Sequence, residues 1–297
     1  MPGPLIECVP NFSEGRDRAR FEAIRDAIAT APGVMLLKSE MDPDHHRSVI
    51  TFAGSPAAVF EAAFRGVRTA SELIDLTTHA GAHPRIGAAD VVPFVPVEGM
   101  TLEDCAALAH RFGAKVWNEL RIPVYFYEAA ARHPDRVQLE NVRRGGFETP
   151  QCAPDLGGPE LHPRAGACIV GARKFLIAYN INLATADVEI ARKIAKRIRA
   201  SSGGMPHVKA LGLHLKSRNL AQVSMNLTDY EQTPLHAVFE RVREEAAALG
   251  VSIAGSEIIG LLPMKAVEQA AAHFLAIENF DSGQILENRL RTWTSAY

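Results

Sequence analysis

In the first half of the chain, the spacing of hydrophobic residues alternates between the period of a helix and that of an extended strand. Phe21, Ile24 and Ile28 recur at helical spacing and predict one face of a helix. The sequence DPDHH separates two extended runs and predicts the turn of a hairpin. The predicted elements are a strand at 5–10, a helix at 16–30, a hairpin of 34–37 and 47–53, a helix at 56–76 and a strand at 90–97. This βαββαβ order is typical of a ferredoxin-like domain.

The second half repeats this order after a segment rich in glycine and proline, residues 145–166, which we interpret as a linker. Before that segment, a helix begins at Thr101, with Asp104 three residues later as in a capping box, and a strand follows at 122–127. The later elements are a strand at 167–179, a helix at 186–200, a hairpin of 208–216 and 221–227, a helix at 233–249 and a strand at 251–256.

The order of elements predicts an α/β (α+β) fold of two ferredoxin-like βαββαβ subdomains side by side. We expect residues 1–175 to form the first subdomain, including the linker-like segment 145–166, and residues 176–297 to form the second. A groove between two such subdomains is a favoured place for a ligand.

Composition is that of a soluble globular protein. The 297 residues are 47% hydrophobic and 22% charged, with a net charge of −2, so nothing points to nucleic acid or to a membrane as a partner. The start of the chain has no leader pattern, and no apolar run approaches the roughly 18 residues of a membrane span, so we expect a cytoplasmic protein. The cysteines are widely separated and form no C-x-x-C, which suits a reducing compartment.

The stretch THAGAHPRIGAADVVPF, residues 78–94, places histidines, an arginine and an aspartate between glycines and prolines. Gly81 and Pro84 disfavour a helix with His79 and His83 on one face, and no H-E-x-x-H motif is present. We favour a rigid turn from which His83 projects. Because histidine exchanges protons near neutral pH, His83 would be suited to acid/base catalysis there. Two alternatives stay open: His79 or His83 caps the preceding helix, or a metal site draws on His79, His83, Asp42, Asp44, His45 and His46.

Arginine and asparagine residues are candidates for binding polar ligands. Arg47 and Arg85 flank the same predicted helix, so we expect them to form a local anion site. Asn180 and Asn182 share one face of a strand by its two-residue period and would line a polar surface. No G-x-G-x-x-G or P-loop pattern follows a strand, so a nucleotide is not indicated. Arg173 and Lys174 are two further candidates. Charged residues on the exposed edge of a sheet would also explain their presence.

Four stretches of the chain resemble the glutamate formiminotransferase family, the transferase part of formiminotransferase-cyclodeaminase. They are ECVPNFSEG at 7–15, HAGAHPRIGAADVVPF at 79–94, GARKFLIAYNINL at 171–183 and NLAQVSMNLTDYEQTPLH at 219–236. The resemblance covers about residues 5–290 and implies two α/β subdomains, folate in a positively lined groove between them, and a homodimer. Because the sequence stops at residue 297, we expect a single-function form that depends on a separate cyclodeaminase.

The resemblance also implies roles for individual residues. His83, the histidine of the H-P-R motif, is the expected catalytic acid/base. Glu40 or Asp42 occupies the place of an active-site carboxylate of the family. Either of these residues or Asp90 would stabilise the positive charge on the amidine group of the substrate. The expected substrate- or anion-binding residues are Arg47, Arg85, Arg173, Lys174, Asn180 and Asn182. The expected folate-binding stretch, in which Ala165 replaces an aromatic residue, is Gly157, Gly158, Pro159, Glu160, Leu161, His162, Pro163, Arg164, Ala165 and Gly166.

The activity that the resemblance implies is transfer of the formimino group from N-formimino-L-glutamate to N5 of tetrahydrofolate, in histidine degradation. Tetrahydrofolate is then a co-substrate, and the chemistry needs no metal. A related folate enzyme that handles a 5-formyl group would make the same acid/base demand. A metal-dependent formiminoglutamate hydrolase would use the histidines and aspartates as ligands, and a non-catalytic folate-binding protein would not need His83.

Overall fold

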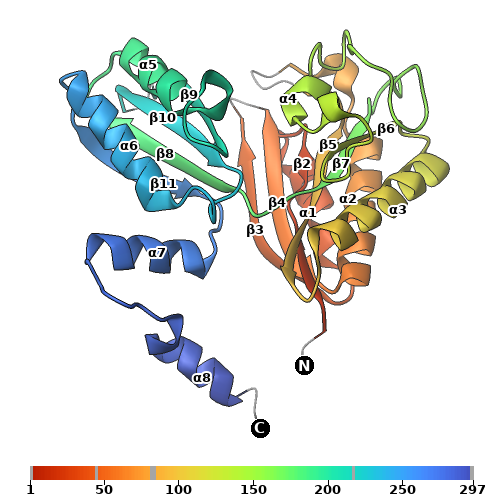
Figure 1. Cartoon of the computed structure of the whole chain (residues 1–297). Helices are drawn as coiled ribbons and strands as arrows, with labels where there is room; N and C mark the ends of the chain where they lie inside the picture. Colours follow the sequence, from red (N-terminus) through yellow and green to blue (C-terminus); the bar gives the residue numbers. More distant parts are fainter. Residues whose placement is uncertain (1–2, 44–45, 81–84, 216–217, 295–297) are drawn as a thin grey trace. The chain divides into compact units, whose positions relative to one another are not determined.

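The computed structural model describes residues 3–43, 46–80, 85–215 and 218–294, with side chains up to residue 290 (Figure 1). The chain divides into two compact units, unit 1 at Met1–Lys174 and unit 2 at Phe175–Tyr297. Each unit has its own sheet, helices and hydrophobic core. The predicted mixed α/β class is therefore confirmed.

Unit 1 contains a mixed sheet in the spatial order β1-β4-β2-β5-β7-β6, in which β3 also pairs with β4 and β1 with β5. Its strands are β1 (Leu5–Cys8), β2 (Asn11–Phe12), β3 (Val34–Asp42), β4 (Arg47–Gly54), β5 (Ala89–Glu98), β6 (Val124–Glu128) and β7 (Cys168–Ala172). Its helices are α1 (Arg18–Ala29), α2 (Pro56–Leu73), α3 (Leu102–Leu120) and α4 (Leu139–Val142), with short 3₁₀ turns η1 (Leu76–Thr78) and η2 (Pro134–Arg136).

The local sequence explains where these elements begin and turn. The Ser55 side chain caps α2 by accepting the N–H of Ala58, and Pro56 occupies the first helical position. Thr101 and Asp104 form the predicted capping box at the start of α3. The predicted hairpin is also confirmed, because β3 and β4 pair antiparallel on either side of the DPDHH turn.

The two faces of the unit 1 sheet carry different layers. Alternate residues such as Phe126 and Val170 pack into the large core with α1, α2 and α3. Their neighbours Tyr125 and Ile169 face the other way and pack with Val142 of α4 in a smaller cluster. The segment 145–166 belongs to unit 1 and is tied to the start of β6 and to the loop before β5 by backbone hydrogen bonds. The site described below lies along these loops.

Unit 2 contains an antiparallel sheet in the order β11-β8-β10-β9, and the α5 and α6 helices pack on one face of it (Figure 1). Its elements are β8 (Ile177–Leu183), α5 (Val188–Ile198), η3 (Ala200–Ser202), β9 (Val208–Leu215), β10 (Leu220–Leu227), α6 (Leu235–Ala248), β11 (Ile253–Ile259), α7 (Met264–Phe274), η4 (Ser282–Gln284) and α8 (Leu286–Thr294).

One predicted strand is wrong. Residues 167–179 do not form a single strand, because β7 ends at Ala172 in the unit 1 sheet and β8 begins at Ile177 in the unit 2 sheet. Periodicity alone could not find this break, since both halves are apolar and buried. The boundary between the units lies within the polar interruption at Arg173 and Lys174.

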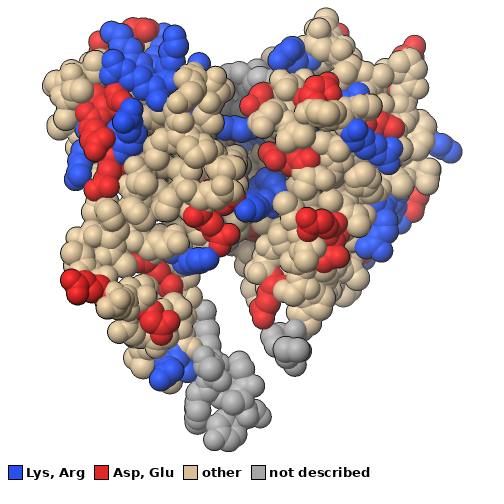
Figure 2. All heavy atoms as spheres, viewed as in Figure 1, with Lys and Arg blue, Asp and Glu red and all other residues tan. Residues whose placement is uncertain are grey.

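Charged side chains of both signs are scattered over the visible faces of the two units (Figure 2). Basic side chains gather over α5, whose sequence VEIARKIAKRI contains four Lys or Arg residues and one Glu, and acidic side chains lie beside them. This mixture agrees with the net charge of −2. Among the described residues, no helix is both long and apolar enough to cross a membrane.

Candidate active site

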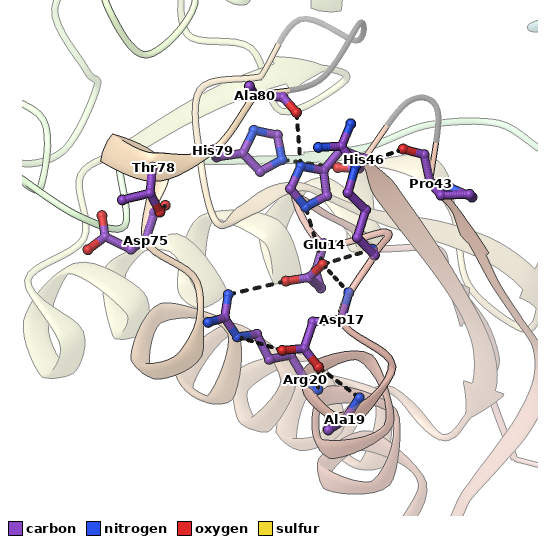
Figure 3. A network of polar contacts seen from close by, with 11 residues as sticks. Glu14, Asp17, Ala19, Arg20, Pro43, His46, Asp75, Thr78, His79 and Ala80 are labelled. Atoms are coloured by element: carbon purple, nitrogen blue, oxygen red, sulfur yellow. Dashed lines mark hydrogen bonds and ion pairs between the residues drawn. The ribbon is translucent and has the colours of Figure 1, made fainter.

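Glu14 is a buried carboxylate in the turn between β2 and α1, and its side chain is 3% exposed. Its Oε1 accepts backbone N–H bonds from Arg16 and Asp17, both at 2.9 Å, and lies 3.3 Å from Nε2 of His46 (Figure 3). Burial alone would raise the pKa of Glu14, but these backbone donors and His46 outweigh it and lower the pKa. Glu14 is therefore an ionised acceptor near neutral pH.

His46 lies between that carboxylate and the chain that leads into the H-P-R loop. Its Nδ1 is 3.1 Å from the carbonyl oxygen of Ala80, and its Nε2 faces Glu14 (Figure 3). Both ring nitrogens thus face oxygen acceptors. A doubly protonated ring makes both hydrogen bonds, whereas a neutral ring makes one. His46 therefore links the Glu14 carboxylate to the backbone at Ala80.

His79 stacks on His46, with ring centroids 4.0 Å apart and planes 9° from parallel. Its Nε2 donates to the carbonyl oxygen of His46 at 3.1 Å, so Nδ1 of the neutral ring is an acceptor. That Nδ1 is buried and has no hydrogen-bond partner in the described part of the chain. Burial, together with the charges of His46 and Arg85, lowers the pKa of His79. The helix predicted at 56–76 ends at Leu73 with Ile74 as its C-cap, and His79 is the C-cap of the short turn η1, where its N–H bonds to Leu76.

Arg85 ties down the other side of the H-P-R loop. Its Nη2 donates to the carbonyl oxygen of His79 and to Glu148 Oε1, both at 2.8 Å. The chain on both sides of the loop is thus held by hydrogen bonds. His83, the predicted acid/base residue, lies outside the described residues.

Asp90, which is 1% exposed, is the centre of a second buried polar cluster, at the start of β5. Its Oδ2 lies 2.6 Å from Arg143 Nη2 and 3.5 Å from Arg47 Nη1, and its Oδ1 accepts the N–H of Ile86 at 2.8 Å. Burial opposes the ionisation of Asp90, but the two guanidinium groups outweigh it, so the pKa of Asp90 is lowered. Burial and the neighbouring Arg143 lower the pKa of Arg47 in turn. Arg47 also donates to Asn11 Oδ1 from Nε and Nη2.

Two guanidinium groups share one carboxylate in this cluster, because both Arg47 and Arg143 face Asp90. Tyr127 lies close enough to Arg47 to affect its pKa. Two arginines with a single carboxylate between them suit a further carboxylate as a ligand. Sequence analysis missed Arg143, whose only signal was its place in the RRGG run that opens the glycine-rich segment.

The structure separates several residues that the sequence grouped. Arg47 and Arg85 do not form one anion site in the described contacts, because Arg47 binds Asp90 and Asn11 whereas Arg85 binds Glu148 and His79. Glu40 is exposed and pairs with Lys38 at 2.8 Å. Asp42 is exposed at the end of β3, and Asp90 is neutralised by arginines.

The end of the segment predicted to bind folate pairs with residues 86–88, directly after the H-P-R motif. Backbone hydrogen bonds of 2.9 Å join Ala88 N to Ala165 O and Ala167 N to Ile86 O. Gly87 and Gly166 form an antiparallel bridge between these bonds. Ala165 is 1% exposed and so offers no surface on which a ring could stack. The same turn is closed by paired backbone bonds between His162 and Gly166, and its Arg164 pairs with Asp75 at 2.9 Å.

In unit 2, Asn180 and Asn182 share the sheet face opposite the core, as predicted. They belong to a hydrogen-bonded network with Gln222 and Glu257. Within the described ranges, no group of three or more His, Cys, Asp or Glu side chains has the geometry to hold a metal ion.

Comparison with known proteins gives a consistent family. Residues 5–173 match the formiminotransferase domain, N-terminal subdomain, and residues 178–290 match the formiminotransferase domain. Glutamate formimidoyltransferase of Thermoplasma acidophilum is 49% identical over 96% of this chain and 97% of its own length, and that of Streptococcus pyogenes serotype M1 is 44% identical over 96% and 98%. Formimidoyltransferase-cyclodeaminase of Mus musculus is 44% identical over 91% of this chain and 52% of its own length. The chain therefore belongs to the formiminotransferase family.

Proposed function

We propose that this chain is a glutamate formimidoyltransferase, which moves the formimino group from N-formimino-L-glutamate to N5 of tetrahydrofolate and releases L-glutamate. The observation that carries the proposal is the pairing of two segments of unit 1. Residues 86–88, directly after the H-P-R motif, are hydrogen-bonded neighbours of residues 165–167, so a catalytic histidine on the first segment and a folate site on the second would lie close together. The relatives that match nearly the whole chain bear the same enzyme name.

The reaction requires two proton movements. N5 attacks the amidine carbon and loses its proton, and the nitrogen of glutamate must gain a proton before the carbon–nitrogen bond breaks and it leaves as an amine. One histidine that accepts the first proton and donates the second serves both steps. We assign this role to His83. The lowered pKa of His79 favours its neutral ring, whose Nδ1 lone pair would act as a hydrogen-bond acceptor beside the same loop.

The substrates carry several carboxylates, which suit the arginines of unit 1. Arg47 and Arg143 share the single carboxylate of Asp90, and a substrate carboxylate there would bind to the same two guanidinium groups. Arg85 and Lys174 are further candidates for binding these carboxylates. Folate would bind along residues 157–166, and holding both substrates together would supply much of the acceleration.

The proposal extends to the location, the oligomeric state, the pathway and the subdomains of the enzyme. We propose a cytoplasmic homodimer that works without a metal ion and passes 5-formiminotetrahydrofolate to a cyclodeaminase on another polypeptide. We also propose that Met1–Lys174 and Phe175–Tyr297 correspond to the two formiminotransferase subdomains, in support of which the two family matches end and begin at residues 173 and 178.

The deciding measurement is glutamate release from N-formimino-L-glutamate by chelator-treated protein, with and without tetrahydrofolate. Release that requires tetrahydrofolate supports the transferase. Release without folate that returns on addition of metal would instead support a hydrolase. Turnover of 5-formyltetrahydrofolate, with none of formiminoglutamate, would support an enzyme that handles formyl groups.

A further inference from the structure

Unit 2 contains a polar network on the sheet face that α5 and α6 do not cover. Asn182 of β8 lies opposite Gln222 of β10, and Asn180 of β8 lies opposite Glu257 of β11. Gln222 Nε2 donates to Asn182 Oδ1 at 2.8 Å and to Glu257 Oε1 at 2.9 Å. Asn180 Nδ2 donates to the same Glu257 oxygen at 3.3 Å. The amides of Asn180, Asn182 and Gln222 are 9%, 2% and 3% exposed.

The carboxylate in this network is held by amides alone. In the described part of the chain, Glu257 forms no ion pair with Lys, Arg or His, and its Oε2 accepts no hydrogen bond. Asp90 and Glu14, two buried carboxylates of unit 1, each have cationic partners. A partly buried charge without a counter-ion is costly, so a carboxylate kept in this state is suited to a cationic ligand.

The geometry restricts the ligand further. One carboxylate oxygen is already fixed by two N–H donors, which orients the other. A planar group that bears two N–H donors on one carbon matches a fixed carboxylate through parallel hydrogen bonds, as guanidinium groups do. The amide oxygens of Asn180 and Gln222 are additional acceptors for the same donors.

We propose that Glu257, oriented by Asn180 and Gln222, binds a planar N–C–N group with N–H donors on both nitrogens. The inference rests on the proposed function, in which two substrates contain this chemistry. One is the amidine of N-formimino-L-glutamate, and the other is the 2-amino-pyrimidinone edge of tetrahydrofolate. The missing counter-ion favours the amidine, because it is the group that carries a positive charge.

The test variant is Glu257→Gln, which removes the negative charge and keeps the size of the side chain. We expect the KM for formiminoglutamate to rise roughly 10- to 100-fold, the range for a lost hydrogen bond to a charged group, while the KM for tetrahydrofolate stays within about twofold. Glu244→Gln, on the exposed side of α6, is the matched control and should leave both constants unchanged. A rise in the tetrahydrofolate KM alone would identify the pterin edge as the ligand. Two unchanged constants would overturn the inference.

A binding probe separates this inference from the proposed function. Formamidinium carries the N–C–N cation, and formamide is its neutral counterpart, so calorimetry with each probe needs no turnover. Wild type and Glu257→Asp should bind formamidinium more tightly than formamide, and Glu257→Gln should lose the difference. Equal binding of both probes by folded wild-type protein would refute the Glu257 site, whereas failure of glutamate release would refute the transferase and leave the probe result standing.

Discussion

The rings of His46 and His79 lie stacked 4.0 Å apart, and the backbone carbonyl of His46 accepts the Nε2 proton of His79. Glu14 lies on the far side of His46 and provides a negative charge to the pair. Burial of the stacked ring is the main reason that the pKa of His79 is lowered, so the neutral form of His79 is favoured. The arrangement fixes His79 and Ala80, the last described residues before the H-P-R loop.

Glu14→Gln should destabilise the protein at neutral pH. The variant removes a buried carboxylate that accepts two backbone N–H groups and faces His46, and we expect a loss of about 1–3 kcal/mol. Since the folded-state pKa of Glu14 is lowered, its contribution is present above the unfolded pKa of about 4.5 and disappears as the pH falls through the folded pKa. Denaturant unfolding at pH 7 and at pH 3 measures the difference.

The control for Glu14 is Glu22→Gln, which removes the carboxylate of an exposed ion pair with Arg18. Exposed pairs contribute little, so this variant should change the free energy of unfolding by less than about 0.5 kcal/mol. Equal stability of Glu14→Gln and Glu22→Gln at pH 7 would contradict the importance of the Glu14 contacts.

His83→Ala should retain the fold and folate binding but lose at least the roughly 100-fold in turnover that is typical of a missing acid/base group. The measurement is kcat for tetrahydrofolate-dependent glutamate release, beside the Kd for tetrahydrofolate. His133→Ala changes an exposed histidine in the turn before η2 and serves as the control. A turnover near that of wild type would remove His83 from the proposed mechanism.

Sequence reasoning found most of the elements because short-range physics determines them. Ser55, Thr101 and the DPDHH turn act through neighbours within a few residues, and the structure places the helix starts and hairpin where these signals predict them. The break at Arg173 depends instead on which sheet accepts each strand. Pairing partners distant in sequence leave no local signal, so the two strands were predicted as one.

The site was predicted less completely for the same reason. The H-P-R loop and the 157–166 stretch could be recognised as segments, but their backbone pairing depends on the fold of the whole unit. Arg143 and Glu257 lie in stretches without a motif, and each becomes informative only through a partner distant in the chain, Asp90 for one and Gln222 for the other.

Glu7→Gln should stabilise the protein at alkaline pH. Burial raises the pKa of the Glu7 carboxyl to about 6, and the nearby Arg173 only partly offsets it. The folded state therefore binds more protons than the unfolded state between about pH 4.5 and 6, and stability falls as the pH rises through this window. A shift of this size corresponds to about 2 kcal/mol. Unfolding at pH 4.5 and pH 8 should show the gain for Glu7→Gln only at pH 8, and a gain of the same size at both would contradict it.

Gly166→Ala should loosen the contact between the two segments on which the proposed function depends. Gly166 has a φ of +69°, and an added Cβ would lie 2.0 Å from the carbonyl oxygen of Ile86, which is rigid backbone. Gly203 has a φ of +80° with no atom within 4 Å of an added Cβ, so Gly203→Ala isolates the cost of the backbone conformation, about 1 kcal/mol. We expect Gly166→Ala to cost at least about 2 kcal/mol and to weaken tetrahydrofolate binding, whereas Gly203→Ala leaves binding unchanged. Thermal unfolding and folate titration of both variants measure this, and an unaltered folate Kd in Gly166→Ala would show that folate binding does not depend on this pairing.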